Sequence, residues 1–272
     1  MSLTRINANI QALKSLNAFT AVNKKIEDSQ TRLATGKRIN SAGDDPAGYN
    51  LSRSLESRRR GLSTALDNVN NAKNVLTIAE GGYSNVMDIL QTLKEKASQA
   101  SDGTLNSTQR TALNDQVSAL ISEIDDIVSE TTFNDASLID GTFATTFQTG
   151  ENATDSLSVT LLDSDSAALG INSISLSTQA SATAALSAID SAINTLATRT
   201  QDVGEYQARL NAKDATLSVA ITNTESIRST LEDADFAKEQ VDLLKYNILQ
   251  QTSLSSLAQA NQAPNAVLSL FG

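Results

Sequence analysis

The chain has 272 residues, a formal net charge of −10 at pH 7, two Pro and no His, Cys or Trp. It is long enough to bury a sizeable core, but the missing His and Cys remove the commonest proton shuttle, the thiol nucleophile and most zinc ligands, so we expect neither an enzyme nor a cofactor. The net negative charge argues against nucleic-acid binding. The sequence contains no run of about 20 apolar residues, so no membrane span is predicted.

The first predicted element is an amphipathic helix of about 30 residues whose apolar stripe shifts phase near its middle. One run consists of Leu3, Ile6, Ile10 and Leu13, and the next of Leu16, Phe19, Ile26 and Leu33. Gly36 and the stretch 40–46 end this helix. The same N-terminus lacks the basic-then-apolar layout of a cleaved secretory signal, so we expect any export to use another route.

A second, longer helix is predicted from Pro46 to about Ala100. Asp44 or Asp45 is expected to cap it, in preference to forming a metal-binding pair, because no other ligand stands at useful spacing. Its apolar residues follow alternating steps of three and four: Leu62, Ala65, Val69, Ala72, Leu76, Ala79, Tyr83, Val86, Leu90, Leu93, Ala97 and Ala100. Such a repeat predicts helices packed side by side. The stripe is widened by Leu66, Val75, Met87 and Ile89, which predicts more than one partner helix.

Two features of this long helix have alternative readings. Gly81 and Gly82 indicate either the close approach of a neighbouring element or a bend, and we favour close packing. The basic run 58–60 is expected to be a solvated or salt-bridged face rather than a phosphate site, because its arginines spread around the helix axis.

A turn near 101–103 and a resumed apolar stripe predict a third helix, antiparallel to the second. The stripe consists of Leu113, Val117, Leu120, Ile124 and Ile127. Residues 132–178 are then expected to form a small β-rich excursion, because SLSVTLL at 156–162 alternates at period two before its end and Asp140-Gly141 and Gly150 are turn signals.

Helical periodicity returns from Leu186 to Leu231, with a break or bend expected near Gly204. A final helix carries Val241, Leu244, Ile248, Leu254 and Leu257 and is expected to end near Pro264. Both ends of the chain are thus apolar helices, although termini normally fray in solvent. Either they cover each other within a stable monomer, or the native state is an assembly, and non-closing contacts between copies generate helical filaments.

Several ordered motifs at both ends resemble the bacterial flagellins. They are TRLATGKRINSAGDDPAGY at 31–49, TTFNDASLIDGTF at 131–143, STLEDADFAKE at 229–239 and SLSSLAQANQAPNAVLSLFG at 253–272. The resemblance covers nearly the whole chain. It implies a mainly α fold: an elongated antiparallel helical bundle or coiled coil with a small β-hairpin region and paired N- and C-terminal helices.

The resemblance also implies two domains and a function. Residues 1–40 and 236–272 would form the coiled-coil core of a filament, and 41–235 a helical rod without large outer domains. The chain would be a structural subunit of the extracellular flagellar filament, exported without a cleaved signal peptide through the flagellar type III channel. Its partners would be copies of itself, sister flagellins, the filament cap and junction proteins, and an export chaperone at the C-terminal helix.

Two groups of residues follow as candidate sites. Contacts in the filament are expected from Leu3, Ile6, Ile10, Leu13, Leu16, Phe19, Leu254, Leu257, Leu268, Leu270 and Phe271. The innate immune receptor for flagellin recognises a patch of the rod in some members of the family. Here Thr92, Lys96 and Gln116 replace an Arg, a Leu and a Glu of the recognised type, so we expect weak recognition.

Other classes of protein explain less of the sequence. A hook–filament junction protein shares the terminal helices, and an intracellular coiled-coil scaffold accounts for the heptads but not for the terminal motifs. The sequons at Asn106 and Asn152 are short motifs with little weight as evidence of glycosylation.

Overall fold

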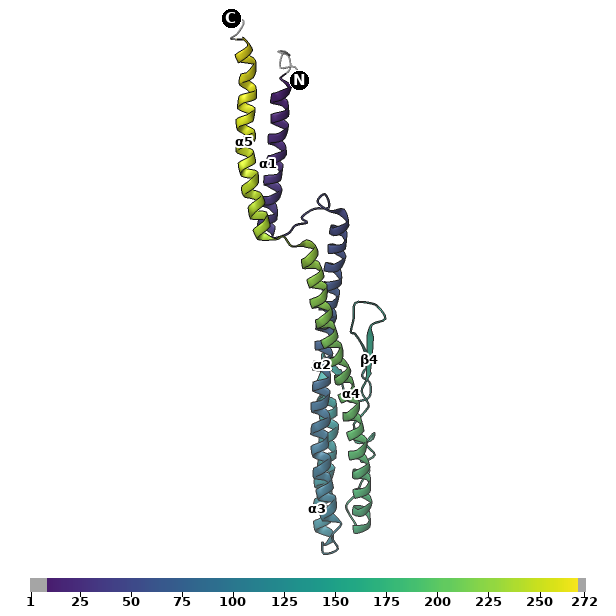
Figure 1. Ribbon diagram of the computed structural model, residues 1–272. Helices are drawn as coiled ribbons and strands as arrows, with labels where there is room; N and C mark the ends of the chain where they lie inside the picture. Colours follow the sequence, from purple (N-terminus) through teal and green to yellow (C-terminus); the bar gives the residue numbers. More distant parts are fainter. Residues whose placement is uncertain (1–8, 269–272) are drawn as a thin grey trace. The chain divides into compact units, whose positions relative to one another are not determined.

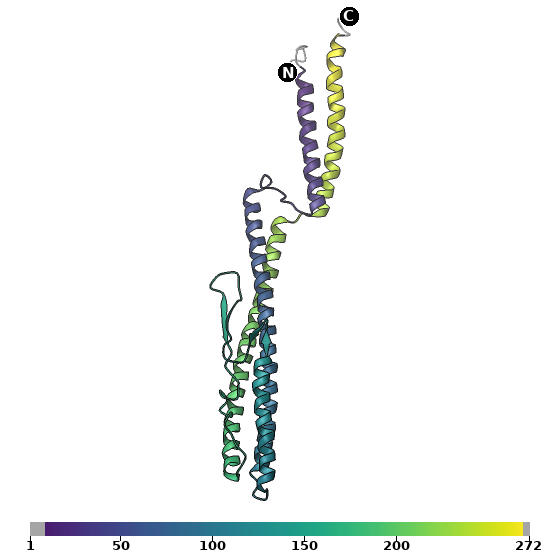
Figure 2. The same cartoon turned by 180° about the vertical axis from the view of Figure 1, so that it is seen from behind.

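The computed structural model describes residues 9–268, with side chains described through residue 262. The helices are α1 (Ile10–Thr35), α2 (Pro46–Ala100), α3 (Ser107–Glu130), α4 (Gln179–Glu232) and α5 (Phe236–Leu268). The strands are β1 (Thr132–Phe133), β2 (Ala136–Ser137), β3 (Ala144–Gln148) and β4 (Ser156–Thr160) (Figures 1 and 2). The predicted mainly α fold with a small hairpin region is therefore confirmed.

The chain divides into two compact units whose boundaries lie inside α2 and α4. The central unit is residues 58–222, and the terminal unit is the described part of 1–57 together with 223–272. Each unit is considered by itself below.

Long-range polar contacts show that α4 runs antiparallel to α2 in the central unit. Lys73 Nζ lies 3.0 Å from Asp214 Oδ2, and Lys94 Nζ lies 2.7 Å from Asp190 Oδ1. Between them, Gln207 Nε2 donates to Glu80 Oε2 at 2.8 Å. Positions that rise along α2 therefore meet positions that fall along α4, which places the two helices in one antiparallel register.

The heptad stripe of α2 is the centre of the core. All twelve positions predicted from the three-four repeat are buried, and they form one cluster with apolar residues of α3, α4 and the β segment. Of the widening positions, Val75 is buried and Leu66, Met87 and Ile89 are partly buried against the cluster. The wide stripe thus reflects several partners within one subunit, as predicted.

The two neighbouring glycines of α2 differ in their surroundings, although the helix runs through both. A Cβ at Gly82 would lie 2.8 Å from Thr131 Cγ2 and 3.0 Å from Ile139 Cδ1. A Cβ at Gly81 would meet nothing within 4 Å. The close-packing interpretation therefore holds for Gly82, where the segment after α3 approaches α2, and not for Gly81.

Arg110 and a capping box close the turn between α2 and α3. The buried Arg110 guanidinium donates to the carbonyls of Ala100, Asp102 and Leu105, which satisfies acceptors that the end of α2 leaves free. Asn106 caps α3, with its side chain and that of Gln109 each accepting from the other residue's backbone. The antiparallel third helix is therefore confirmed.

The strands form two antiparallel two-stranded sheets within residues 132–160, and 161–178 contains turns. In β4, Leu157 and Val159 are buried while the alternate residues are exposed, as the period-two pattern predicts. Side chains of α3 hold the turn region. Asp125 accepts hydrogen bonds from the backbone N–H and the hydroxyl of Ser166, and Asn114 Oδ1 accepts from the Leu176 N–H.

A predicted helix break and a predicted helix end are wrong. No break occurs near Gly204, because α4 is continuous from Gln179 to Glu232. The cost of about 1 kcal/mol for one helical glycine is offset there by burial of Val203 and Leu210. The final helix also continues past Pro264 to Leu268, since a proline removes one backbone donor without ending a helix whose flanking residues stay helical.

The connection from α1 to α2 follows the predicted signals. Gly36 ends α1 in the left-handed region at φ 71° and donates to the Arg32 carbonyl. Asp45 Oδ1 accepts from the Gly48 N–H at 2.9 Å, which confirms Asp45 as the cap of α2. Asp44 accepts from the N–H groups of Ser41 and Asn40, and these bonds lower the pKa of its carboxyl.

Candidate functional site

Helices α1 and α5 form an antiparallel pair in the terminal unit (Figures 1 and 2). Three contacts fix its register. Asn9 Nδ2 donates to the Ala260 carbonyl at 2.8 Å, Gln250 Nε2 donates to Asn23 Oδ1 at 2.7 Å, and Arg32 Nη1 lies 3.2 Å from Glu239 Oε1. The predicted pairing of the terminal helices is therefore confirmed.

The seam between these helices is narrow and partly polar. Ile26 and Ser29 of α1 are buried, and so are Glu239 and Ala260 of α5. Phe19, Val22 and Leu33 lie at the same three-four spacing as Ile26 and are half-buried. Lys25 Nζ lies 5.6 Å from the ring centroid of Tyr246. Small residues and hydrogen bonds, rather than a broad apolar core, hold the pair together.

A large apolar surface remains exposed on both helices. On α1, Leu13 is 63% exposed, and on α5, Val241 and Ile248 are each 65% exposed. The exposed set is Ile10, Leu13, Leu16, Phe236, Val241, Leu244, Ile248, Leu249 and Leu254, which we call the terminal apolar surface. So many large apolar residues on one pair of helices indicate an interaction surface.

The sequence-predicted contacts fall into three groups. Ile10, Leu13, Leu16 and Leu254 belong to the terminal apolar surface, whereas Phe19 and Leu257 are half-buried. Leu3, Ile6, Leu270 and Phe271 lie outside the described residues, and Leu268 is the last residue of α5 with no side chain described.

Sequence reasoning missed five members of the terminal apolar surface as site residues: Phe236, Val241, Leu244, Ile248 and Leu249. Three of them belong to the apolar stripe expected for the last helix, so their periodicity was visible. Periodicity does not say whether a stripe faces a partner within the chain or outside it, because both require the same spacing.

The receptor-patch positions lie on two helices of the central unit. Thr92 and Lys96 on α2 are half-buried, and Gln116 on α3 is exposed. Thr92 Oγ1 donates to the Asp88 carbonyl of its own helix at 3.0 Å. The patch therefore offers one cation and two neutral polar groups.

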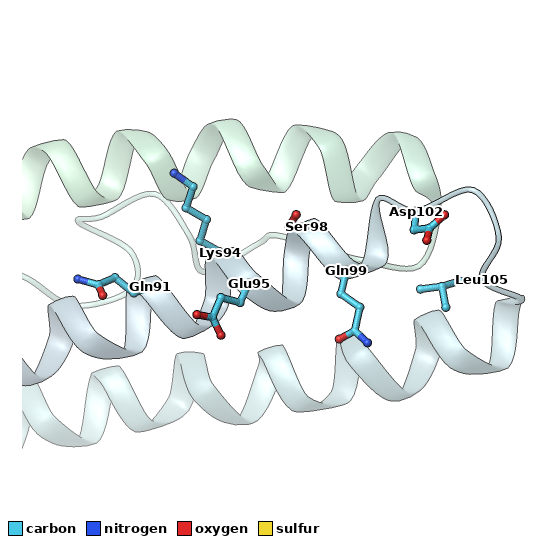
Figure 3. A pocket seen from close by; sticks show the side chains of 7 residues that line it. All are labelled: Gln91, Lys94, Glu95, Ser98, Gln99, Asp102 and Leu105. Atoms are coloured by element: carbon cyan, nitrogen blue, oxygen red, sulfur yellow. The ribbon is translucent and has the colours of Figure 1, made fainter.

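A groove of about 760 Å³ lies along the same part of α2. Its lining residues are Gln91, Lys94, Glu95, Ser98, Gln99, Asp102 and Leu105. In Figure 3, Lys94 points toward α4, where it pairs with Asp190, while Glu95 and Gln99 point toward α3. This lining provides no nucleophile held by a base, so the groove gives no reason to infer catalysis.

Within residues 9–268, no cluster of three or more acidic side chains is arranged to hold a metal ion. Nor is any helix of that described stretch both long and apolar enough to cross a membrane.

Two family models match the chain. The bacterial flagellin N-terminal helical region matches residues 6–144, and the bacterial flagellin C-terminal helical region matches residues 186–271. Flagellin of Bacillus subtilis (strain 168) is 35% identical, with 98% of this chain and 99% of the relative aligned. Flagellin FlaB2 of Treponema pallidum (strain Nichols) is 31% identical with the same coverage.

A solved structure of a putative flagellar hook-associated protein from Vibrio parahaemolyticus shares the fold. Its TM-score is 0.60 at 15% sequence identity, over 70% of this chain and 100% of that chain. At that identity the likeness concerns the fold alone, whereas the curated relatives aligned over their full length are flagellins. The chain belongs to the bacterial flagellin family.

Proposed function

We propose that this flagellin is a structural subunit that polymerises into the bacterial flagellar filament, the propeller of swimming cells, through the terminal apolar surface. The observation that carries the proposal is the set of large apolar side chains that α1 and α5 leave exposed although the two helices are paired. Burying one side chain of this size contributes about 1.5–3 kcal/mol. Contacts with neighbouring copies would therefore stabilise the filament.

The proposal includes the sequence-predicted contacts outside the described side chains. Leu3, Ile6, Leu268, Leu270 and Phe271 would extend the same surface toward the ends of the chain. Phe19 and Leu257 would act differently, since both are half-buried and hold the pair that presents the surface. In this scheme residues 1–40 and 236–272 serve as the filament core and 41–235 as the rod.

Leu13→Asp tests the surface directly. Leu13 is 63% exposed in the subunit, so a carboxylate there should leave the helical circular-dichroism signal and the stability of the monomer unchanged while abolishing filaments. A charge buried at an interface without a partner is strongly unfavourable. Filament formation is measured by sedimentation and by electron microscopy of sheared cell-surface filaments.

Thr20→Asp on the same helix is the matched control, because Thr20 is exposed and polar. It is expected to form filaments. Normal filaments from Leu13→Asp would refute the proposed surface. Leu257→Asp should also abolish filaments, but with disturbed α1–α5 pairing, which limited proteolysis of the monomer detects as faster cleavage.

Export follows as a second part of the proposal. The subunit would leave the cell through the flagellar type III channel without a cleaved signal peptide, and a chaperone would cover the C-terminal helix before export. The exposed α5 residues Val241, Leu244 and Ile248 support this, since an apolar helix face needs cover in the cytosol. An intact N-terminus in mass spectra of secreted subunits would support it, and a truncated one would contradict it.

Weak recognition by the innate flagellin receptor is the third part. Thr92, Lys96 and Gln116 would replace the cation, the apolar contact and the carboxylate of a recognised patch. A reporter-cell response comparable to that of a strongly recognised flagellin would overturn this part and leave the filament function in place.

A further inference from the structure

The two connecting segments of the terminal unit are hydrogen-bonded to each other. One connection, residues 36–45, joins α1 to α2, and the other, residues 233–235, joins α4 to α5. Arg38 N–H donates to the Glu232 carbonyl at 2.6 Å, and Ala234 N–H donates to the Gly36 carbonyl at 2.9 Å. Lys37 and Asp233 thereby form an antiparallel bridge. A short piece of β-pairing thus links the start of one connection to the other.

The side chain of Glu232 reinforces this pairing from the last residue of α4. Its Oε1 accepts from Lys37 Nζ at 2.7 Å, and its Oε2 accepts from Ser52 Oγ at 2.9 Å and from Arg228 Nη1 at 2.7 Å. The side chain is 12% exposed. A single carboxylate therefore joins the α1–α2 connection, the first turns of α2 and the end of α4.

The surrounding charges balance the burial of this carboxylate. Lys37 lies on the connection, Arg53 and Glu56 lie on α2, and Glu225 and Arg228 lie on α4. Arg228 also contacts Glu225 at 2.5 Å and Glu56 at 3.8 Å. A buried charge tolerated in this way is strongly destabilising when its partner is removed.

Ionisation of Glu232 is favoured by these partners. Burial alone would raise the pKa of the Glu232 carboxyl, but the hydrogen bonds from Lys37 and Ser52 outweigh burial and lower the pKa below its ordinary value. The carboxylate therefore stabilises the folded chain at neutral pH. That contribution is lost as the pH falls through the folded-state pKa, below the usual range for glutamate.

We propose that Glu232 is a positioning residue that holds the paired connections together and so fixes the α1–α5 pair to the adjoining ends of α2 and α4. The inference rests on the proposed function in one respect: filaments need the terminal apolar surface held in one orientation. The pairing of the connections themselves is a property of the single subunit and can be measured without polymerisation.

Amide hydrogen exchange of the monomer tests the proposal. Glu232→Gln keeps the shape of the side chain and removes its charge. It should lower the protection of the Arg38 and Ala234 amides by about tenfold or more, as expected when charge-assisted hydrogen bonds are lost. Protection of buried α2 amides such as that of Val86 should not change. Ser52→Ala, which removes one hydrogen-bond donor to the Glu232 carboxylate, should produce a smaller loss at the same two amides.

Glu225→Gln is the matched control, since it removes a carboxylate that pairs with the same arginine, Arg228, within α4. It should leave the Arg38 and Ala234 amides protected. Amide protection measured over a pH series adds a second test, because a side chain with a purely steric role would give no pH dependence. Protection in the parent chain should hold at neutral pH and fall only below the ordinary glutamate pKa of about 4.3, while Glu232→Gln should show the low value throughout.

Equal protection of Arg38 and Ala234 in Glu232→Gln and the parent chain would overturn the proposal, and so would the same loss in Glu225→Gln. Filament yield is measured in parallel and is expected to fall in Glu232→Gln. A parent chain that forms no filaments would refute the proposed function and leave the exchange result standing. If Glu232→Gln lost protection at the Arg38 and Ala234 amides and still formed normal filaments, assembly would not depend on the paired connections. That result would overturn the positioning role.

Discussion

The stripe of α2 in the central unit and the stripes of α1 and α5 in the terminal unit have the same three-four spacing and opposite burial. From Val69 to Ala100 the α2 positions are fully buried or nearly so, whereas Leu13, Val241 and Leu244 are more than half exposed. The difference lies in the partners. The α2 stripe meets apolar residues of α3, α4 and the β-rich segment 132–178, while α1 and α5 pair with each other. An apolar repeat indicates that one face of a helix is to be buried. Whether that face is buried within the subunit or against another molecule depends on how many elements of the same chain pack against it.

The largest expected contrast comes from truncating one leucine in each region. Leu90 is fully buried in the central unit, so Leu90→Ala should lower the free energy of unfolding by about 2–5 kcal/mol. Leu244 is 62% exposed, so Leu244→Ala should change it by less than about 0.5 kcal/mol. Urea denaturation of the monomer measures both. Similar losses from the two variants would erase the distinction between the stripes.

A second prediction concerns how the central unit closes on itself. Arg110→Ala would leave the carbonyls of Ala100, Asp102 and Leu105 without their donor, so we expect a loss of about 1–3 kcal/mol and faster exchange in residues 101–106. Hydrogen exchange followed by mass spectrometry locates the effect. Unchanged exchange in the turn would show that water replaces the guanidinium without cost.

The adjacent glycines of α2 provide a matched pair for close packing. Gly82→Ala pushes a Cβ against Thr131 and Ile139 and should destabilise the monomer by about 1–3 kcal/mol. Gly81→Ala enters open space in a helix and should stabilise it by about 0.5–1 kcal/mol. Thermal denaturation gives both signs, and a shift in the same direction for both variants would contradict the packing described for Gly82.

The smallest expected effect is a dependence of the fold's stability on pH through Tyr83, in the core around α2. Burial raises the pKa of Tyr83 to about 12, and its hydroxyl donates to the Leu162 carbonyl at 2.9 Å. A raised folded-state pKa means that the neutral phenol stabilises the fold below the ordinary tyrosine pKa near 10, and that this contribution is lost as the pH rises toward 12. Ultraviolet titration of tyrosinate should show a late-ionising component that is absent in Tyr83→Phe. Ionisation of all tyrosines near pH 10 would contradict this burial.

Much of the fold could be predicted from local signals. The α2 heptads, the Asp45 cap, the end of α1 at Gly36 and the alternation in β4 all act over a few residues, and the structure contains each of them. The errors near Gly204 and Pro264 arose because breaker residues were given too much weight in long helices. The cost of one glycine or one lost backbone donor is small beside the packing of the turns around it.

The candidate site was predictable only in part. The apolar character of α1 and α5 was evident, but which residues face each other depends on the register that Asn23–Gln250 and Arg32–Glu239 contacts fix across more than 200 residues of sequence. The bonds of Glu232 to Lys37 and Ser52 were equally inaccessible, since no local pattern pairs residues so far apart in the chain.

Cysteine labelling tests the central claim most directly, because the chain contains no cysteine and a single introduced thiol is therefore unambiguous. The claim is that polymerisation buries the terminal apolar surface. Leu13→Cys should react rapidly with a thiol reagent in the monomer and many-fold more slowly in the filament. Ile26→Cys, at a position 8% exposed in the α1–α5 seam, should react slowly in both. Equally fast labelling of Leu13→Cys in monomer and filament would contradict the claim.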